Sequence, residues 1–293
     1  MEELGYIYKA FQTWDKICHA RGYQSLHMVI LDPERVLDPF PWPVPSFDEF
    51  FTWCLRQPGF SLPYMQLEGL ARGPHVEQFG SATDNAPVER PAIQAIEGVD
   101  IPMLTVFAHS DKFEKEYNPS YGVDARLEDN LGITEMRTVI AQYQQFLEHH
   151  IDAPLVHLNL LVYFHVTSPS EKLLLKYLSR YQTPTRRIVV TIFSMRKDLQ
   201  WFMLDHQLVL HHKVLSSVEI ERELTSQGGI AVRLPQIRTT DPVARILGLC
   251  PGTVVRIDVP LDSLQDPIYR IVVEGNEQTF EDETEEEDND ESQ

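Results

Sequence analysis

Histidines are the residues of this chain whose type and spacing come nearest to a reactive site. His206 and His212 are six residues apart, so on one extended strand they would share a face, with Asp205 nearby. His149–His150 and His211–His212 are adjacent pairs, and neighbours in a helix or strand point in different directions. A metal or acid–base site needs a further group converging on the same point, and the sequence offers none. We interpret these side chains as structural and expect no metal ligand among them.

Cysteines and known catalytic motifs give no better candidate. The three cysteines, Cys18, Cys54 and Cys250, are far apart, whereas thiolate zinc sites usually contain closely paired ligands. A disulfide framework is equally unexpected, which fits a reducing compartment. The sequence contains no phosphate-binding loop, dinucleotide fingerprint, HExxH pair or GxSxG elbow. We therefore predict no catalytic residue, no metal and no cofactor.

The charge of the chain limits its partners. The net charge is −19, and residues 281–291 contain nine Asp or Glu and no Lys or Arg. Phosphate backbones favour clustered basic residues, so a chain this acidic is a poor autonomous ligand for nucleic acid. No apolar run approaches the roughly 18–20 residues of a membrane span, and the N-terminus lacks the pattern of a signal peptide. We expect an intracellular protein without a membrane partner.

The N-terminal hundred residues combine a helix pattern with a proline-rich segment. Apolar side chains recur at spacings of three and four over residues 3–23, which predicts an amphipathic helix that ends at Gly22. Residues 24–102 contain eleven of the 20 prolines. Because proline removes a backbone donor, we expect no long regular element there, and a loop or insertion over roughly 66–100.

The following hundred residues show an alternating pattern. Apolar runs predict strands at 103–108, 155–166 and 188–193, and helical spacing predicts helices at 134–150 and from Ser168 onward. Strand, helix and strand in this order predict a crossover unit and a small, partly parallel sheet.

Beyond residue 200 the predicted elements are shorter. Residues 204–210 are compatible with a strand and 216–224 with a helix. Asp241 followed by Pro242 and, later, by Gly248 is typical of a short helix that Asp caps, Pro opens and Gly closes. Alternating apolar residues at 255–259 and 269–273 predict two strands that pair with each other.

These patterns predict an α+β fold with two domains. Residues 1–203 would form an α/β domain with a small mixed sheet and a proline-rich insertion at about 24–101. Residues 204–274 would form a small mixed α/β domain. Residues 275–293 would be a disordered acidic tail, since like charges at this density repel one another.

The most distinctive pattern is Leu-Pro, a short gap, Asp-Pro-Val-Ala-Arg and then Gly-Leu, over residues 234–249. It continues with Gly252 and a Val-rich segment to Ile257, and His206-Gln207-Leu208-Val209 precedes it. This pattern resembles the small subunit shared by eukaryotic RNA polymerases I, II and III, whose C-terminal domain corresponds to a small subunit of archaeal RNA polymerase. The resemblance is strong after residue 204, moderate over 102–200 and poor over 24–101.

The resemblance implies a non-catalytic subunit of a multisubunit DNA-dependent RNA polymerase. The C-terminal assembly domain would dock on the largest subunit, and the N-terminal jaw-like domain would lie near downstream DNA. That DNA would be contacted indirectly or by few side chains, and a homo-oligomer is not expected. The implied subunit-interface residues are Leu234, Pro235, Ile237, Asp241, Pro242, Ala244, Arg245, Gly248 and Gly252. The candidates for a position near DNA are Lys112, Lys115 and Arg126.

Departures from the family pattern leave alternatives open. Gln236 stands where a basic residue is usual, and the turn Leu249–Gly252 lacks two positive charges. With the insertion and the acidic tail, this divergence suggests a large DNA virus with its own polymerase. The chain would then work in the virion or in the cytoplasm or nucleus of the infected cell, whereas a cellular member would be nuclear. A free transcription-regulatory adaptor and a metal-dependent nuclease built on residues 102–200 are the alternative functions.

Overall fold

A computed structural model of the chain describes residues 2–30, 46–56, 65–78, 93–108, 130–163, 165–226, 234–259 and 266–275. Lys112, Lys115 and Arg126 lie outside these ranges, as does the predicted disordered tail from residue 276 onward.

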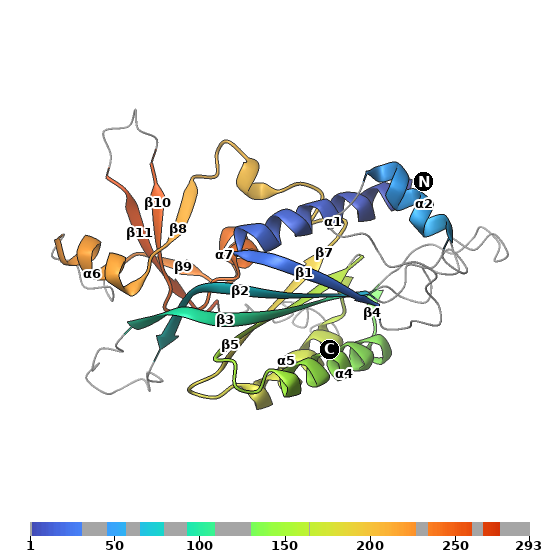
Figure 1. Ribbon diagram of the computed structural model, residues 1–293, viewed down its shortest axis with the longest axis horizontal. Helices are drawn as coiled ribbons and strands as arrows, with labels where there is room; N and C mark the ends of the chain where they lie inside the picture. Colours follow the sequence, from blue (N-terminus) through green and yellow to red (C-terminus); the bar gives the residue numbers. More distant parts are fainter. Residues whose placement is uncertain are drawn as a thin grey trace, which may run out of the picture.

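The N-terminal part of the chain is built on a five-stranded mixed sheet, with the strand order β1-β2-β3-β5-β7 (Figure 1). The first three strands are antiparallel, and β3, β5 and β7 are parallel. The strand β5 is buried along its whole length, as expected of a central strand covered on both faces. The bounds are Tyr23–Ile30 for β1, Met65–Gln78 for β2, Ile93–Ala108 for β3, Leu155–Val162 for β5 and Arg187–Ser194 for β7.

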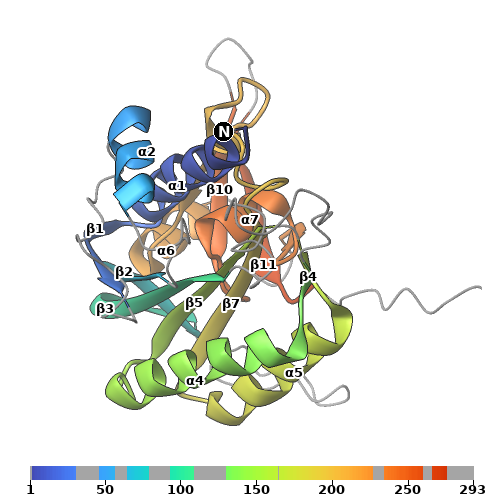
Figure 2. The same ribbon diagram turned by 90° about the vertical axis from the view of Figure 1, so that its right-hand side faces the viewer.

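Helices cover both faces of this sheet. The helices α1 (Glu2–Ala20) and α2 (Phe47–Arg56) pack on one face, in a core cluster around Phe11, Trp14 and Phe107. The helices α4 (Ile133–His149) and α5 (Ser168–Leu178) lie side by side on the other face (Figure 2). Two short strands, β4 (Asn130–Leu131) and β6 (His165–Val166), pair just before these helices begin. None of the described helices is long and apolar enough to cross a membrane.

The expectation that residues 24–102 contain no long regular element is wrong. The strands β2 and β3 pair along most of their length, so a large part of the predicted loop at 66–100 is a hairpin of two long strands. Each of these two strands contains one proline, at a position where the missing backbone donor is tolerated. Pro74 coincides with an irregularity of the register, beyond the residues of β2 that pair with β1, and Pro102 precedes the residues of β3 that pair with β5.

A second, four-stranded sheet forms the C-terminal part, with the order β8-β10-β11-β9. The strands β8 and β11 each pair antiparallel with β10, whereas β9 lies parallel to β11 at the edge. The predicted pairing of the two strands near 255 and 269 is confirmed, and so is the α+β fold class. The bounds are His211–Val214 for β8, Ser217–Ser226 for α6, Gln236–Arg238 for β9, Pro242–Leu247 for α7, Val254–Asp258 for β10 and Ile268–Val273 for β11.

The predicted strand at 204–210 is wrong, and with it the shared face of His206 and His212. A 3-10 turn, η3, occupies Met203–Asp205, and the first strand of the second sheet begins only at His211. Phe202, Met203 and Leu204 pack against the core cluster under α1, which holds this part of the chain in a turn. The ring of His206 lies against Trp201 instead, with 5.8 Å between the ring centroids.

Candidate functional site

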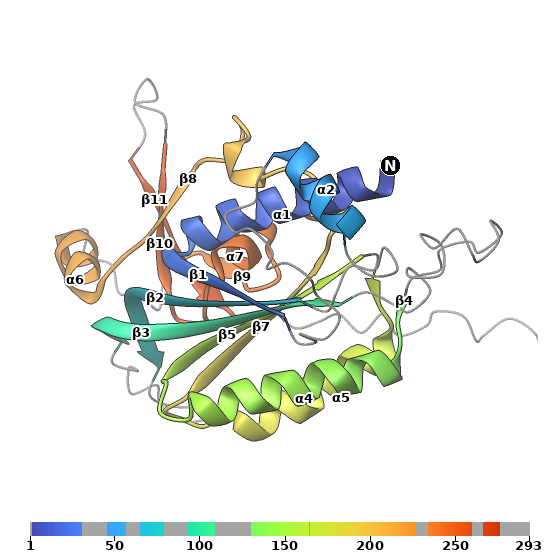
Figure 3. The same cartoon turned by 45° about the vertical axis from the view of Figure 1, so that its right-hand side comes forward.

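The nine predicted interface residues come together around β9 and α7, at the junction of the two sheets (Figure 3). Most of them serve the chain's own packing. Ile237 and Ala244 are buried in the core of the second sheet, and Gly248 and Gly252 are buried glycines with positive φ. The residues of this region that stay exposed are Pro235, Gln236, Arg238, Thr240 and Pro242, which we call the β9 surface.

The short helix α7 is capped at both ends as predicted. The Oδ1 atom of Asp241 accepts hydrogen bonds from the backbone N–H groups of Val243 at 2.8 Å and Ala244 at 3.4 Å. Pro242 occupies the first turn, where its missing N–H costs nothing. Gly248 ends the helix at φ 63°, and the N–H of Leu249 returns to the carbonyl of Ala244. This Schellman arrangement satisfies carbonyls that the helix end would leave without a partner.

Arg21 connects the C-terminal end of α7 to the first sheet. Its Nε donates to the carbonyl of Ile246 and its Nη2 to that of Arg245, both at 2.7 Å. Its Nη1 donates to Oδ1 of Asn159 in β5 at 2.8 Å. Burial lowers the pKa of the guanidinium, but its charge suits this position because the end of a helix carries partial negative charge. The guanidinium also lies over Trp14, 5.4 Å from the ring centroid.

Arg245 makes a second connection in the opposite direction, from α7 to β7. Its Nη2 donates to the carbonyl of Ile192 at 2.5 Å, and its guanidinium lies over Phe193 at 5.0 Å from the ring centroid. It also approaches Asp198, at 3.6 Å. β7 is the edge strand of the first sheet, so Arg245 satisfies an outward carbonyl of that edge. Sequence analysis placed Arg245 at the subunit interface, and the structure gives its head group partners within the chain.

Polar side chains inside the first sheet extend the junction. The Tyr23 hydroxyl is hydrogen bonded to Nδ1 of His157 at 2.8 Å, and the Tyr143 hydroxyl donates to the carbonyl of Asn159 at 2.7 Å. Burial raises the pKa of both tyrosines. Burial likewise raises the pKa of the Cys250 thiol to about 11. The two tyrosine hydroxyls, buried and hydrogen bonded in this way, stabilise the fold.

Sequence analysis did not identify Arg21, His157 or Asn159 as junction residues. Arg21 was interpreted only as part of the helix end, and its partners are more than a hundred residues away along the chain. A signal for the other two was present in the sequence. His157 and Asn159 are the polar residues of the otherwise apolar strand Leu155–Val162, and a polar group buried in a strand needs a partner.

At least one histidine of each adjacent pair has a hydrogen-bond partner within the chain. Nδ1 of His149 is hydrogen bonded to the carbonyl of Gln145, and Nδ1 of His211 to Oδ2 of Asp258. Within the described ranges, no group of three or more His, Cys, Asp or Glu residues is arranged to hold a metal ion.

A cleft of about 680 Å³ lies next to this junction, between the N-terminal part and the C-terminal part of the chain. The edge strand β7 forms one wall, where the Gln182 side chain and Arg245 cover the carbonyls of Ile188 and Ile192. The helix α5, the helix α7 with the turns on either side of it, and the last described residues, Glu274 and Gly275, form the other walls.

Substituting Gly248 by alanine tests how tightly this junction is packed. A Cβ atom there would lie 3.1 Å from Nε of Arg21 and 3.2 Å from Cε1 of His157, on a backbone with positive φ. We expect Gly248→Ala to lower the free energy of unfolding by about 2 kcal/mol, from left-handed strain and crowding together. Gly5→Ala is the matched control, because Gly5 is helical with open space around it. Urea unfolding that gives the same loss for both variants would contradict tight packing at Gly248.

Comparisons with known proteins match the part of the chain that carries the β9 surface. Residues 202–272 match the family model described as RNA polymerase Rpb5, C-terminal domain. The DNA-directed RNA polymerase subunit Rpo5 of Archaeoglobus fulgidus is 37% identical over 76 residues, which cover 26% of this chain and 100% of that protein. Rpo5 of Methanococcoides burtonii is 34% identical over 73 residues, 25% of this chain and 94% of that protein.

The matched range contains β8, β9, β10 and nearly all of β11, together with α6 and α7. The capped helix, the two buried glycines and the paired strands described above all lie within it. A unit of this length, similar to complete archaeal subunits, shows that the chain belongs to the family of RNA polymerase subunits formed by Rpb5 and the archaeal Rpo5 proteins.

Proposed function

We propose that this chain is a structural, non-catalytic subunit of a multisubunit DNA-dependent RNA polymerase and that it assembles with the other subunits of that enzyme. The proposal rests on the similarity between the C-terminal part of the chain and archaeal polymerase subunits. For the subunit of Archaeoglobus fulgidus, this similarity covers the whole length of that protein. The same part has a complete four-stranded sheet and its own core clusters around Val255 and Val254, as an assembly unit requires. We place the boundary between the jaw-like and assembly domains at residues 203 and 204.

The β9 surface is our proposed contact with the largest subunit. β9 is an edge strand, in which Gln236 and Arg238 are exposed and Ile237 between them is buried. Pro235 and Pro242 flank it and are also exposed. The buried members of the predicted interface, such as Ala244 and the two glycines, would shape this surface from within. Exposed side chains on a rigid, capped framework are suited to specific docking, because little order is lost on binding.

The first sheet with its two helix layers is our proposed jaw near downstream DNA. Lys112, Lys115 and Arg126 remain the proposed residues near that DNA. We place the chain in the transcription machinery of the nucleus or, for a viral polymerase, of the infected cell or virion.

Purification of the tagged full-length chain from its source cells tests the proposed function. We expect the largest polymerase subunit and this chain in equal amounts, and we expect both to remain together through washing at high salt. A chain recovered in small and variable proportion to the polymerase would contradict a subunit and support a free adaptor instead. The tag expressed alone is the control for nonspecific recovery.

A further inference from the structure

The edge strand β7 directs a row of backbone groups into the cleft next to the junction. The N–H and C=O of one residue in a strand point to the same edge, and successive residues alternate between the two edges. The N–H of Arg187 donates to the carbonyl of Pro154, so the odd-numbered residues of β7 face β5. The even-numbered residues Ile188, Val190 and Ile192 therefore face outward, and all three line the cleft.

Side chains cover the outward carbonyls at the two ends of this row and leave its middle open. The Gln182 side chain donates to the carbonyl of Ile188 at 3.3 Å, and Arg245 donates to that of Ile192 at 2.5 Å. Among the residues that the structure describes, none is hydrogen bonded to the outward N–H or C=O of Val190. Val190 is only partly buried. The middle of the edge thus offers one donor and one acceptor, which is what another strand pairs with.

Apolar side chains line the cleft on both sides of this edge. On the side of α4 and α5, Leu175 is 38% exposed. On the opposite side, which α1 and α7 cover, Ala244 and Leu249 line the cleft. Figure 2 shows α5 and α7 on opposite sides of β7. Successive side chains of an extended chain point to opposite faces, so a strand added to β7 would contact both apolar surfaces.

The charged side chains that line the cleft balance one another. Arg187 and Arg245 are matched by Glu171 and Glu274, so the lining has no excess of either sign. A polyanion such as nucleic acid needs clustered cations, which this lining does not supply. A neutral polypeptide segment is complementary to the cleft in its charge, in its backbone hydrogen bonds and in its apolar side chains.

We propose that the cleft beside β7 is a docking site for an extended, uncharged segment of a separate polypeptide, which pairs with Val190 and adds a strand to the first sheet. The row from Ile188 to Ile192 is about 13 Å long, which corresponds to about five residues of the incoming segment. Its backbone would displace the exposed Gln182 side chain from the carbonyl of Ile188. Main-chain hydrogen bonds give such a contact its affinity, and the two apolar surfaces select the side chains.

Hydrogen exchange of the full-length chain with isotope-labelled valine tests the docking by NMR. In the free chain, the amide of Val190 should exchange faster than that of Val189, which faces β5. The probe is the neutral peptide acetyl-Thr-Val-Thr-Val-Thr-amide, and the same peptide with every backbone nitrogen methylated is the control. At millimolar concentration, the probe should slow exchange at Val190 at least ten-fold, and the methylated peptide should not.

Three outcomes of this experiment would overturn the proposal. The first is no slowing at Val190 by the probe, and the second is equal slowing by both peptides, since only the probe can form backbone hydrogen bonds. The third is slow exchange at Val190 in the free chain, which would mean that another part of the same chain already occupies the edge.

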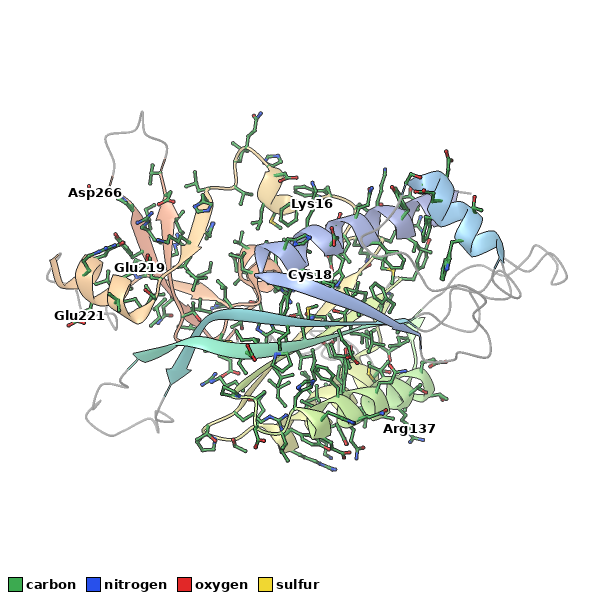
Figure 4. The ribbon with its side chains drawn as sticks, in the orientation of Figure 1. Lys16, Cys18, Arg137, Glu219, Glu221 and Asp266 are labelled. Atoms are coloured by element: carbon green, nitrogen blue, oxygen red, sulfur yellow. The ribbon has the colours of Figure 1, made fainter. Side chains whose placement is uncertain are left out.

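Substitutions in the cleft separate docking from folding. Leu175→Glu puts a charge in one apolar wall at an exposed position, so it should weaken binding of a fluorescently labelled probe at least ten-fold with an unchanged circular dichroism spectrum. Val218→Glu on α6, at 64% exposure, is the matched control and should bind as the unchanged chain does. The helix α6 lies well away from the layer of α4 and α5, as Figure 4 shows for Glu221 relative to Arg137. Equal binding by the two variants would contradict docking in the cleft.

Val190→Pro tests the backbone contact itself. Proline is tolerated at an edge strand where the N–H faces outward, so the pairing of β7 with β5 should persist. We expect this variant to lose binding of the labelled probe at least ten-fold, because the outward donor is gone. Unchanged binding by a folded Val190→Pro variant would show that the probe does not pair with β7.

Discussion

Arg21→Met is expected to lower the free energy of unfolding by about 3 kcal/mol, because it removes three hydrogen bonds donated by a charged group. The carbonyls of Arg245 and Ile246 and the side chain of Asn159 would each lose their partner. Methionine keeps much of the aliphatic volume, so the loss reports mainly the polar contacts. The guanidinium also stacks on Trp14, so tryptophan fluorescence should register the change together with circular dichroism in urea.

Two matched variants separate the causes of this effect. Arg21→Lys keeps the charge but not the planar fork, so we expect it to retain only part of the stability. Lys16→Met removes a cation from the same helix, where the partner is Asp205 at an exposed position. Surface ion pairs contribute about 0–1 kcal/mol, so this change should have a small effect. Equal losses for Arg21→Met and Lys16→Met would contradict a junction built on Arg21.

Short sequence patterns were sufficient to predict the elements whose ends are determined by residues nearby in the chain. The helix α7 begins after Asp241 and ends at Gly248 as predicted, because its caps are formed by residues within a few positions of its ends. The strands β10 and β11 followed equally from alternation over five or six residues. The residues that start and end such elements lie within or next to them, so a single sequence is enough to locate these elements.

Long-range contacts explain the parts that sequence analysis missed. The hairpin of β2 and β3 was hidden by its prolines, whose tolerance depends on which neighbouring strands end nearby. The turn at Met203–Asp205 replaced a predicted strand because Phe202 and its neighbours pack under α1. Arg21 meets α7 across more than two hundred residues of sequence, and no local pattern encodes that pairing.

The same contacts change which residues can serve as a test of docking. Asp241 caps its helix and Arg245 holds β7, so substitutions at either position would weaken the fold as well as any interface. A loss of binding by such variants would not separate the two effects. Exposed positions on β9 avoid this problem, because Gln236 and Arg238 are exposed on either side of the buried Ile237.

Gln236→Glu combined with Arg238→Glu is expected to reduce recovery of the largest polymerase subunit at least ten-fold, with folding unchanged. The two substitutions place two negative charges at the centre of the β9 surface. Charge that does not complement the partner surface costs an interface several kcal/mol. Neither alters the buried Ile237 or the backbone pairing of β9 with β11. Pull-down of the tagged full-length variants with quantitative mass spectrometry measures the effect, and circular dichroism confirms the fold.

Exposed residues of α6 provide the matched control. Val218→Glu combined with Arg222→Glu changes the net charge by the same amount on α6, where Val218 is 64% exposed. We expect this variant to recover the polymerase as the unchanged chain does. If the α6 variant lost the polymerase and the β9 variant kept it, the docking surface would lie on α6 and not on the β9 surface. Equal loss in both would mean that the interface depends on the charge of the whole assembly domain, since charge acts beyond contact distance and packing at β9 does not.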